Sequence, residues 1–334
     1  MYAHARIMIA AGALAAIGLG CKTSHGGSEA TGGAGGLPDG GQSGQAGSQA
    51  DGQADGSGGA VTGAGGRGVT GAGGGATAGA AGDPCATAIF CDDFEKYPVG
   101  TAPTTPWRAS TNLGAVAVDT TQSRSGAKSV KLTTQERTTD GIKTAFIELT
   151  GSTIFPVTGD VFYGRMMFRL EAAPATSVHW TFIQGAGVVP GAGYHALYRY
   201  GGQLPIMQGS TFVGSQLMAN YDTPDSYSGT PPQSDCWLHA NKVVVPVGRW
   251  ACAEWKFDGA TNQMSFSLDS APVPSLTMTG VGQGCVHQTT PFTWTAPTFD
   301  RLSLGWESYQ SDGVRTIYLD DVVVSRTPIG CPAP

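Results

Sequence analysis

The chain has 334 residues, a formal net charge of −6 and a charged fraction of 13%, about half of the roughly 25% that is usual for soluble proteins. Its lysines and arginines are scattered singly, so no basic stripe exists that could follow a nucleic-acid backbone. We therefore expect no nucleic-acid partner.

Residues 1–21 have the layout of an export signal. Arg6 precedes an apolar stretch from Ile7 to Leu19, and small residues lead to Cys21, as in a secretory signal peptide. The apolar run of about 13 residues is too short to span a bilayer. Cys21 also suits a bacterial lipoprotein site, at which the cysteine is lipidated, although Gly18 stands where such sites usually carry leucine. Two locations stay open: a lipid anchor on Cys21 in the outer membrane, or plain secretion.

Residues 22–84 form the next segment, which consists mainly of Gly, Ala, Ser, Thr, Gln and Asp and contains no Phe, Trp or Tyr. Such a segment buries too little apolar area to offset the entropy of ordering its backbone, so we expect it to be disordered. As a flexible coil of roughly 60 residues it would extend on the order of 40 Å. The sequence thus predicts a tether that presents a folded domain, residues 85–334.

Six cysteines belong to that domain: Cys85, Cys91, Cys236, Cys252, Cys285 and Cys331. An even number on an exported chain predicts three disulfides, whose pairing the spacing does not decide. A zinc site is the alternative. It is disfavoured because no Cys-x-x-Cys pair occurs and no histidine lies at ligand spacing from these cysteines.

The domain lacks helical periodicity and instead shows about a dozen short β-rich runs separated by Gly, Pro, Asn and Asp. In chain order these include KSVKLTT, TAFIELT, VFYGRMMFRL, VHWTFIQG, YHALYRYGG, QLMANYD, KVVVPVG, WACAEWKFDG, MSFSLDS, RLSLGWES and TIYLDDVVVS. The pattern predicts an all-β domain of two packed antiparallel sheets. The turn-rich residues 259–263 predict a hairpin in which Ala251, Ala253 and Trp255 share one face.

Several of these segments resemble a known family. CDDFEKYPVG, SRSGAKSVKL, VPVGRWACAEWKFDG with MSFSLDSAPV, and LSLGWESY with TIYLDDVVVS resemble the concanavalin-A-like jelly rolls of carbohydrate-active proteins. The likeness is greatest to the fungal cellulose-induced protein core and more distant to alginate and glucuronan lyases, and it runs from Asp92 to Arg326. It implies an antiparallel jelly-roll sandwich, expected to be a monomer, that binds polysaccharide across the concave face of one sheet.

The resemblance also implies a structural calcium ion where the first strand, the loop after it and the last strand meet. Matched residue by residue, its oxygen ligands are Glu95, Ser123 and Gly126 of the SRSG loop, and Asp320. Asp321 is expected on the opposite face of the last strand, solvated or paired. The alternative is that these carboxylates simply face solvent at a sheet edge.

Three of the runs offer candidates for the concave face. Elimination from a uronate needs a group that neutralises the carboxylate, a base for the C5 proton and an acid for the leaving oxygen. The candidates are Arg199 with Gln184 or Asn220 as neutraliser, His179 as base, and Tyr198 or Tyr221 as acid. The candidate sugar contacts are Trp180, His195, Tyr200 and Trp237. Because side chains alternate along a strand, Arg199 and Tyr198 are expected to point to opposite faces.

Two functions stay open in this interpretation: a polysaccharide lyase that cleaves a uronate-containing glycan by β-elimination, and a non-catalytic carbohydrate-binding module on the cell surface. A surface adhesion module is a third. The R-x-E-x-R and Q-x-H signatures of alginate lyases are missing, since Gln184 is followed by Gly185 and Ala186. Each candidate also has a structural interpretation: sheet histidines that are simply hydrogen-bonded, tryptophans that fill the core, and an arginine that packs on tyrosines.

Overall fold

The computed structural model describes residues 83–223, 235–281, 284–286 and 294–332. All of them belong to one compact unit, residues 73–334. The predicted signal, the lipidation site at Cys21 and nearly all of the predicted tether lie outside the described residues. Among the described helices, none is long and apolar enough to cross a membrane.

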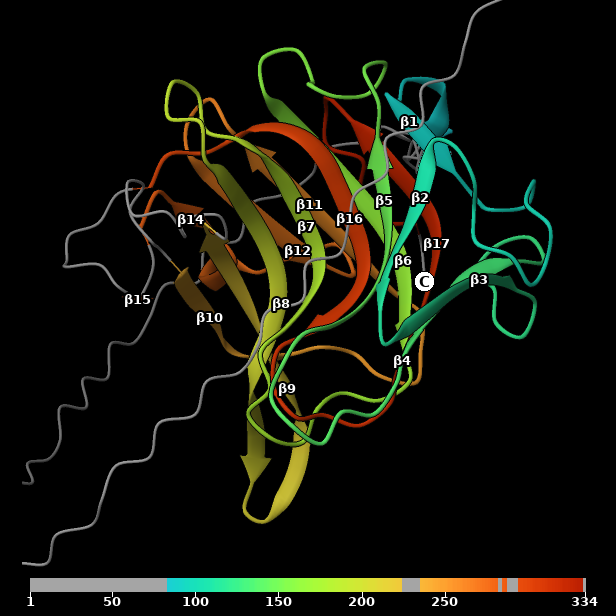
Figure 1. Cartoon of the computed structure of the whole chain (residues 1–334), viewed down its shortest axis with the longest axis vertical. Helices are drawn as coiled ribbons and strands as arrows, with labels where there is room; N and C mark the ends of the chain where they lie inside the picture. Colours follow the sequence, from blue (N-terminus) through green and yellow to red (C-terminus); the bar gives the residue numbers. More distant parts are fainter. Residues whose placement is uncertain (1–82, 224–234, 282–283, 287–293, 333–334) are drawn as a thin grey trace, which may run out of the picture. The chain divides into compact units, whose positions relative to one another are not determined.

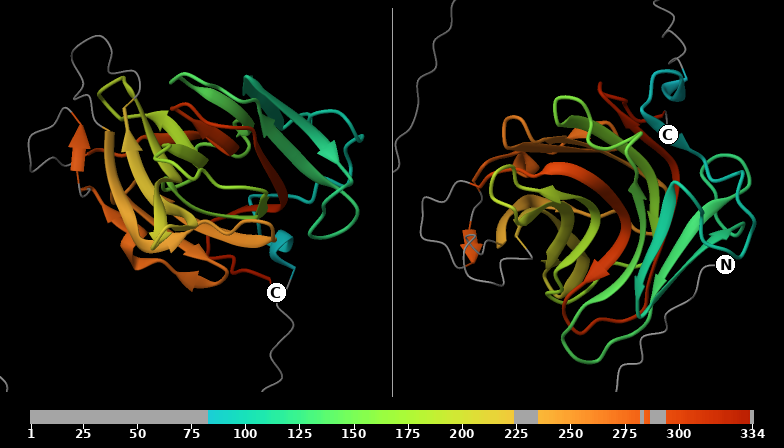
Figure 2. Two further views of the ribbon diagram at one scale, coloured as in Figure 1. Left: turned by 90° about the horizontal axis from the view of Figure 1, so that it is seen from below. Right: turned by 45° about the horizontal axis from the view of Figure 1, so that its top comes forward.

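Two antiparallel sheets form a sandwich, as the sequence predicted (Figures 1 and 2). The first sheet has the order β13 (Ala271–Pro272), β12 (Gln263–Leu268), β11 (Ala251–Asp258), β6 (Val161–Leu170), β17 (Arg315–Ser325), β4 (Ser129–Thr134) and β3 (Gly114–Asp119), with β1 (Phe90–Asp92) beside β17 and β14 (Met278–Thr279) beside β12. A short 3₁₀ helix, Pro84–Ala86, precedes β1, and another, Pro274–Leu276, joins β13 to β14.

The second sheet has the order β15 (Gly284–Val286), β10 (Asp235–Val244), β9 (Thr211–Asp222), β8 (His195–Gln208), β7 (Trp180–Val188), β16 (Thr298–Ser308), β5 (Lys143–Thr150) and β2 (Trp107–Asn112). Its strands bend markedly (Figure 2). We call the side that points away from the first sheet the outer face. This face corresponds to the concave face expected from the sequence.

The core between the sheets is rich in aromatic side chains. Trp180 stacks on Trp306 with ring centroids 4.7 Å apart, and both are at most 1% exposed. The predicted hairpin is confirmed, since Asp258 of β11 pairs with Gln263 of β12. Ala251, Ala253 and Trp255 are buried together on the core side of β11, because alternate residues of a strand point to the same face.

Disulfides tie the segments before β1 and after β17 to the sandwich. Cys85 bonds to Cys91, and Cys252 of β11 bonds to Cys331 across 79 residues of sequence. Cys236 is also disulfide-bonded, and the backbone of β10 places it opposite residue 285 of β15. The expectation that these cysteines form disulfides is thus confirmed for five of them.

Candidate functional site on the outer face

One row of directly opposed residues crosses the outer face of the second sheet. From β10 to β2 the row contains Trp237, Asn220, Arg199, Gln184, Ser303, Glu148 and Arg108. Each of these residues alternates with a neighbour that points into the core, such as Tyr198 beside Arg199. The strand register therefore brings the predicted Arg199, Gln184 and Asn220 together on one surface, as a joint role in neutralising a carboxylate would need.

Arg199 is the most heavily bonded residue of the row. Its Nε donates to Gln184 Oε1 at 2.8 Å and its Nη1 to Asp222 Oδ2 at 2.6 Å. Its Nη2 lies 4.0 Å from Glu307 Oε1, and its guanidinium lies 5.5 Å from the centre of the Tyr309 ring. Burial by itself lowers the pKa of Arg199, but Tyr309, Asp222 and Glu307 outweigh that effect and raise it. The positive charge of Arg199 is therefore permanent and already compensated.

Carboxylates outnumber cations around Arg199. Asn220 Nδ2 donates to the Asp235 carboxylate and to the carbonyl oxygen of Cys236, which fixes Asp235 beside the row. Burial raises the pKa of Asp222, and the neighbouring Arg199 opposes that rise. This part of the outer face therefore presents one guanidinium and the carboxyl groups of Asp222, Asp235 and Glu307.

An irregularity in β7 decides where His179 lies. The register of β7 shifts between Thr181 and Ile183, so the extra residue Phe182 interrupts the alternation. As a result Trp180 and Phe182 both point into the core, at 0% and 1% exposure. Regular alternation from Gln184 would place His179 on the core side. The bulge instead brings His179 to the outer face, so it shares that face with Arg199.

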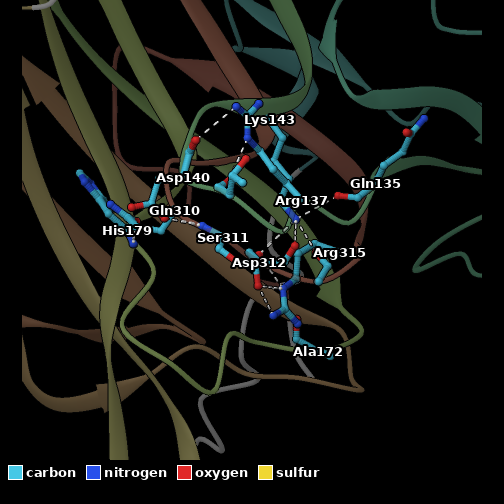
Figure 3. Close-up of polar contacts among 12 residues, drawn as sticks. Gln135, Arg137, Asp140, Lys143, Ala172, His179, Gln310, Ser311, Asp312 and Arg315 are labelled. Atoms are coloured by element: carbon cyan, nitrogen blue, oxygen red, sulfur yellow. Dashed lines mark hydrogen bonds and ion pairs between the residues drawn. The ribbon is translucent and has the colours of Figure 1, made fainter.

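His179 lies at the wall of a pocket of about 260 Å³. The other lining residues are Gln203, Met218, Asp235, Trp237 and Gln310. The backbone N–H of His179 donates to Gln310 Oε1 at 2.6 Å (Figure 3). Burial lowers the pKa of His179 to about 4, so the imidazole is neutral at neutral pH. Its Nε2 is buried and has no hydrogen-bond partner among the described residues.

Tyr309 completes this group, and the sequence did not identify it. Its ring centroid is 4.8 Å from that of His179, and its hydroxyl donates to Glu307 Oε1. Burial raises the pKa of Tyr309 well above the ordinary value, which keeps the phenol protonated. Tyr309 directly follows the last residue of β16, Ser308, where strand alternation no longer predicts direction. The only signal was a tyrosine just beyond the RLSLGWES run.

Four predicted site residues lie in the core instead: Tyr198, Tyr200, Tyr221 and Trp180, all at most 1% exposed. The Tyr198 hydroxyl accepts from Trp294 Nε1 at 3.2 Å, and the Tyr221 hydroxyl donates to the carbonyl of Thr295 at 2.9 Å. Tyr200 likewise donates to a carbonyl inside the sandwich. The prediction that these four residues contact the glycan is therefore wrong, because a side chain between the sheets cannot reach a glycan on the outer face. The expected separation of Arg199 from Tyr198 is confirmed.

The two remaining predicted sugar contacts are accessible. Trp237 is half-buried at the pocket wall, and His195 is exposed at the start of β8. By alternation, His195 shares the outer face with Arg199, near the end of the sheet that lies away from His179.

Several buried polar atoms of this region have no hydrogen-bond partner among the described residues. They are His179 Nε2, Thr181 Oγ1, Asn220 Oδ1, Arg301 Nε and Ser303 Oγ. Buried polar groups are nearly always paired in folded proteins. Similar atoms also occur away from this face, among them Arg165 Nε and Trp255 Nε1 of the first sheet. The five on the second sheet are those that solvent or a ligand on the outer face could satisfy.

The predicted calcium ligands meet around one loop, far along the chain from the outer-face row. Asp320 Oδ2 accepts from the backbone N–H of Arg124 and of Ser125, at 2.8 and 3.2 Å. Glu95 Oε1 accepts from the next amides of the loop, those of Ala127 and Lys128, both at 2.7 Å. The loop thus lies between the two carboxylates, as the resemblance implied.

The donor set fits calcium in chemical type. Asp320 is fully buried and forms no ion pair with a described lysine or arginine, so only amides compensate its charge. Burial raises the pKa of Asp320 to about 7, although backbone hydrogen bonds from Arg124, Ser125 and Asp321 oppose that rise. Within the described ranges, no group of three His, Cys, Asp or Glu side chains could hold a metal. A calcium ion would therefore also need the Ser123 hydroxyl, the Gly126 carbonyl and water.

Asp321 was expected on the opposite face of the last strand, but it contacts the same loop as Asp320. Its φ of 47° is left-handed, and the register of β17 shifts between Asp320 and Val323. This bulge turns the Asp321 carboxylate towards Ser125, whose Oγ donates to Asp321 Oδ1 at 2.6 Å. Two adjacent aspartates are tolerated in a buried strand because the bulge directs both to loop donors.

If calcium binds here, we expect it to raise the melting temperature at about pH 7.5 and not at about pH 4.5. Without metal, the raised pKa of Asp320 means that its stabilising contribution is complete below about pH 4 and is lost as the pH rises to about 7. Asp320→Asn should abolish the response to calcium and raise the metal-free melting temperature at about pH 7.5.

Differential scanning fluorimetry with calcium and with a chelator measures both effects. Asp300→Asn, a change at an exposed aspartate of β16, serves as the control and should leave the calcium response intact. A calcium response that persists in Asp320→Asn would place the ion elsewhere, and no response in the native chain would exclude structural calcium.

A family model described as polysaccharide lyase-like, Cip1-like core domain, matches residues 93–327. No curated protein sequence matches the chain.

Among solved structures, the cellulose-induced protein Cip1 is 21% identical, with 73% of this chain and 100% of that chain covered and a TM-score of 0.46. An endo-β-1,4-glucuronan lyase from the fungus Trichoderma reesei is 16% identical, with 72% and 96% covered and a TM-score of 0.46. An alginate lyase solved with an alginate tetrasaccharide is 11% identical, with 60% and 81% covered and a TM-score of 0.34.

Proposed function

Because the chain belongs to the polysaccharide lyase-like family with the Cip1-like core domain, we propose that it cleaves a uronate-containing glycan by β-elimination on the outer face. The observation that carries this proposal is the meeting of His179, Tyr309 and Arg199 beside one pocket. A neutral imidazole with an unpartnered nitrogen, a protonated phenol and a guanidinium supply the three roles that elimination needs.

In this mechanism His179 Nε2 takes the C5 proton of the uronate. The electron pair of that C–H bond forms the C4–C5 double bond, and the C4–O bond to the neighbouring sugar breaks. Tyr309 gives its proton to the leaving oxygen and would regain one from solvent after product release. The low pKa of His179 ensures that the base is unprotonated before the substrate binds.

Arg199 and the Gln184 amide would face the uronate carboxylate. Withdrawal of charge from that carboxylate makes the C5 proton more acidic, and hydrogen bonds from a buried donor are strong because little water competes. Arg199 already donates to Gln184 and Asp222. We therefore assign it a mainly electrostatic role, as a fixed positive charge at the floor of the site.

The proposal is tested by absorbance of unsaturated uronate while the full-length chain is incubated with a panel of uronate-containing polysaccharides. Absorbance should rise with at least one glycan and should be lost in His179→Ala. Arg326→Ala, which changes an exposed arginine after β17 of the first sheet, should keep the activity. A flat trace across the panel, with the protein shown to be folded, would contradict the lyase assignment.

A second function, non-catalytic carbohydrate binding, is favoured by a different observation. The charge of Arg199 is already satisfied by Asp222 and Glu307, which suits recognition of sugar hydroxyls better than neutralisation of a carboxylate. In that case the chain would be retarded in glycan-containing gels without changing the glycan. Trp237→Ala should abolish the retardation, because an accessible indole at the pocket wall can stack on a sugar ring.

We also propose that the domain works outside the cell as a monomer. The disulfides favour an oxidising compartment, and the predicted signal and tether suit either a lipid anchor at Cys21 or secretion. Metabolic labelling with a radioactive fatty acid distinguishes the two. Label that is lost in Cys21→Ser supports the anchor, and an unlabelled chain in the medium supports secretion.

A further inference from the structure

We propose that a pocket on the first sheet, lined by Trp250, Arg249 and Arg124, binds a uronate unit of an acidic polysaccharide without cleaving it. We call it the Trp250 pocket. It is a second carbohydrate-binding site, separate from the outer face of the second sheet. The inference rests on the proposed function only in its choice of a uronate as the acidic sugar.

The Trp250 pocket lies on the side of the first sheet that points away from the second sheet. Two of its lining residues, Met167 of β6 and Cys252 of β11, are buried directly opposite each other. Their strand neighbours Ala251 and Ala253 belong to the core between the sheets, so alternation directs Cys252 and Met167 to the other side. The volume of about 580 Å³ is within the range of about 300–1,000 Å³ that is usual for ligand sites. The Trp250 pocket shares no lining residue with the pocket beside His179.

Trp250 is one of two tryptophans that the core does not bury. Of the seven tryptophans in the chain, the other five are at most 4% exposed. Trp250 and Trp237 are half-buried, and each of them lines a pocket. Trp250 immediately precedes β11 and is not part of the core cluster. Its indole therefore offers a flat apolar surface on which a sugar ring can stack.

Hydrogen bonds fix Arg249 beside this indole. Its Nη2 donates to Asp269 Oδ2 at 2.7 Å, and its Nη1 donates to the carbonyl oxygen of Trp250 at 3.0 Å. Asp269 is itself held, because its Oδ1 accepts from the backbone N–H of Cys252 at 2.8 Å. The Arg249 side chain is 56% exposed, and a guanidinium has five N–H donors. It can therefore donate to a ligand while it keeps both of these bonds.

Positive charge exceeds negative charge among the described lining residues. Arg249 and Arg124 both line the pocket, and Asp269 is the one carboxylate that does. Asp320, on β17, accepts from the backbone N–H of Arg124 but is completely buried and does not line the pocket. The surroundings of Arg199 on the outer face have the reverse balance, because carboxylates outnumber cations there.

This combination suits an acidic sugar better than a neutral one. The ring would stack on Trp250, and its carboxylate would meet guanidinium groups, whose N–H donors match a carboxylate in a bidentate manner. Because the whole chain carries a net charge of −6, a local excess of positive charge favours this position for an acidic polymer. The described lining residues include no histidine or tyrosine, so the pocket has no counterpart of the His179 and Tyr309 pair.

Two separate sites allow the domain to hold a long acidic polysaccharide at one site while the other acts on it. Retardation in gels of acidic glycan then has a contribution from each site, whereas gels of neutral glycan report the outer face. The retardation that Trp237→Ala should abolish is accordingly the one measured in gels of neutral glycan.

The test is a nuclear magnetic resonance titration that observes each indole N–H of the full-length protein, labelled with isotope in its tryptophans. The protein carries His179→Ala, so that it does not cleave the probe, and Trp250→Phe identifies the Trp250 signal. The probes are hexasaccharides of β-1,4-linked glucuronate, of β-1,4-linked mannuronate and of neutral β-1,4-linked glucose. At least one uronate probe should shift the Trp250 signal, and the neutral probe should bind there about tenfold more weakly.

Arg249→Gln should weaken uronate binding at Trp250 about tenfold, because it removes a charged donor, and Arg249→Lys should keep part of the affinity. Arg326→Gln, at an exposed arginine after β17, is the charge-matched control and should change nothing. The inference is overturned if neither uronate shifts the Trp250 signal, if the neutral probe binds there as tightly, or if Arg249→Gln leaves the affinity unchanged.

These outcomes are separable from those of the elimination assay. Uronate binding at Trp250, without unsaturated product from the native chain, supports this inference and contradicts the lyase assignment. Unsaturated product, with a Trp250 signal that neither uronate shifts, does the reverse.

Discussion

Replacement of Tyr309 by phenylalanine is expected to lower the rate of β-elimination by about 10²- to 10⁴-fold, the usual contribution of a general acid. The change removes only a hydroxyl that donates to Glu307 on the outer face, so the ring still packs 4.8 Å from His179. The fold and the melting temperature should therefore change little. Absorbance of unsaturated product, measured at saturating glycan, reports the loss.

Tyr198→Phe is the matched control for this prediction. It removes a hydroxyl of the same chemistry from the core, where Trp294 Nε1 then loses its acceptor. An unsatisfied buried donor costs about 1–3 kcal/mol, so this variant should be less stable and equally active per folded molecule. If Tyr198→Phe abolished elimination and Tyr309→Phe did not, the acid would lie between the sheets and the site described above would be wrong.

Replacement of Lys143 by alanine is expected to lower the free energy of unfolding by about 3–5 kcal/mol, as for other broken buried ion pairs. The Lys143 side chain is completely buried and lies 3.4 Å from the Asp312 carboxylate, which is 2% exposed. Its Nζ also donates to the carbonyl oxygens of Gln135, Asp312 and Gly313 (Figure 3). Removal of the ammonium leaves all of these acceptors without that partner. Urea denaturation measures the effect.

Lys96→Ala is the control, because Lys96 forms a lysine–aspartate pair with Asp92 whose lysine side chain is 56% exposed. Water screens such a pair, so the expected loss is below about 1 kcal/mol. Equal losses for the two variants would contradict the structural role assigned to Lys143.

The loop after β16, which Lys143 stabilises through Asp312 and Gly313, also contains residues of the candidate site. Asp312 exchanges backbone hydrogen bonds with Arg137, and the amide of Gly141 donates to the carbonyl of Tyr309. Tyr309 and Gln310, on the same loop, contact His179. A folded Lys143→Ala protein should therefore also eliminate more slowly, with its activity partly restored at lower temperature.

Periodicity, together with turn residues, was sufficient to predict the sandwich and the β11–β12 hairpin. These features depend on alternation within regular strands, which burial enforces: a slip of one residue would turn polar side chains into the core. The same rule correctly separated Arg199 from Tyr198.

The errors have two sources. Tyr198, Tyr200 and Tyr221 lie in regular stretches of β8 and β9, where alternation from Arg199 and Asn220 directs them into the core.

Other side chains changed direction where the backbone departs from alternation. The bulge in β7 exchanged the faces of His179 and Trp180 relative to regular alternation, and the bulge in β17 turned Asp321 towards the Ser125 loop. Bulges depend on pairing with neighbouring strands, which a single sequence does not reveal. Tyr309 was missed for a related reason, since its direction is fixed by a loop anchored through Lys143 and Asp312.

The central claim is that the outer face of the second sheet binds the glycan, and a crystal structure of the His179→Ala protein with a uronate-containing oligosaccharide tests it most directly. We predict sugar rings along the outer face, with one ring against Trp237 and a uronate carboxylate beside Arg199 and Gln184. An oligosaccharide bound on the first sheet, with the outer face free of sugar, would contradict the account.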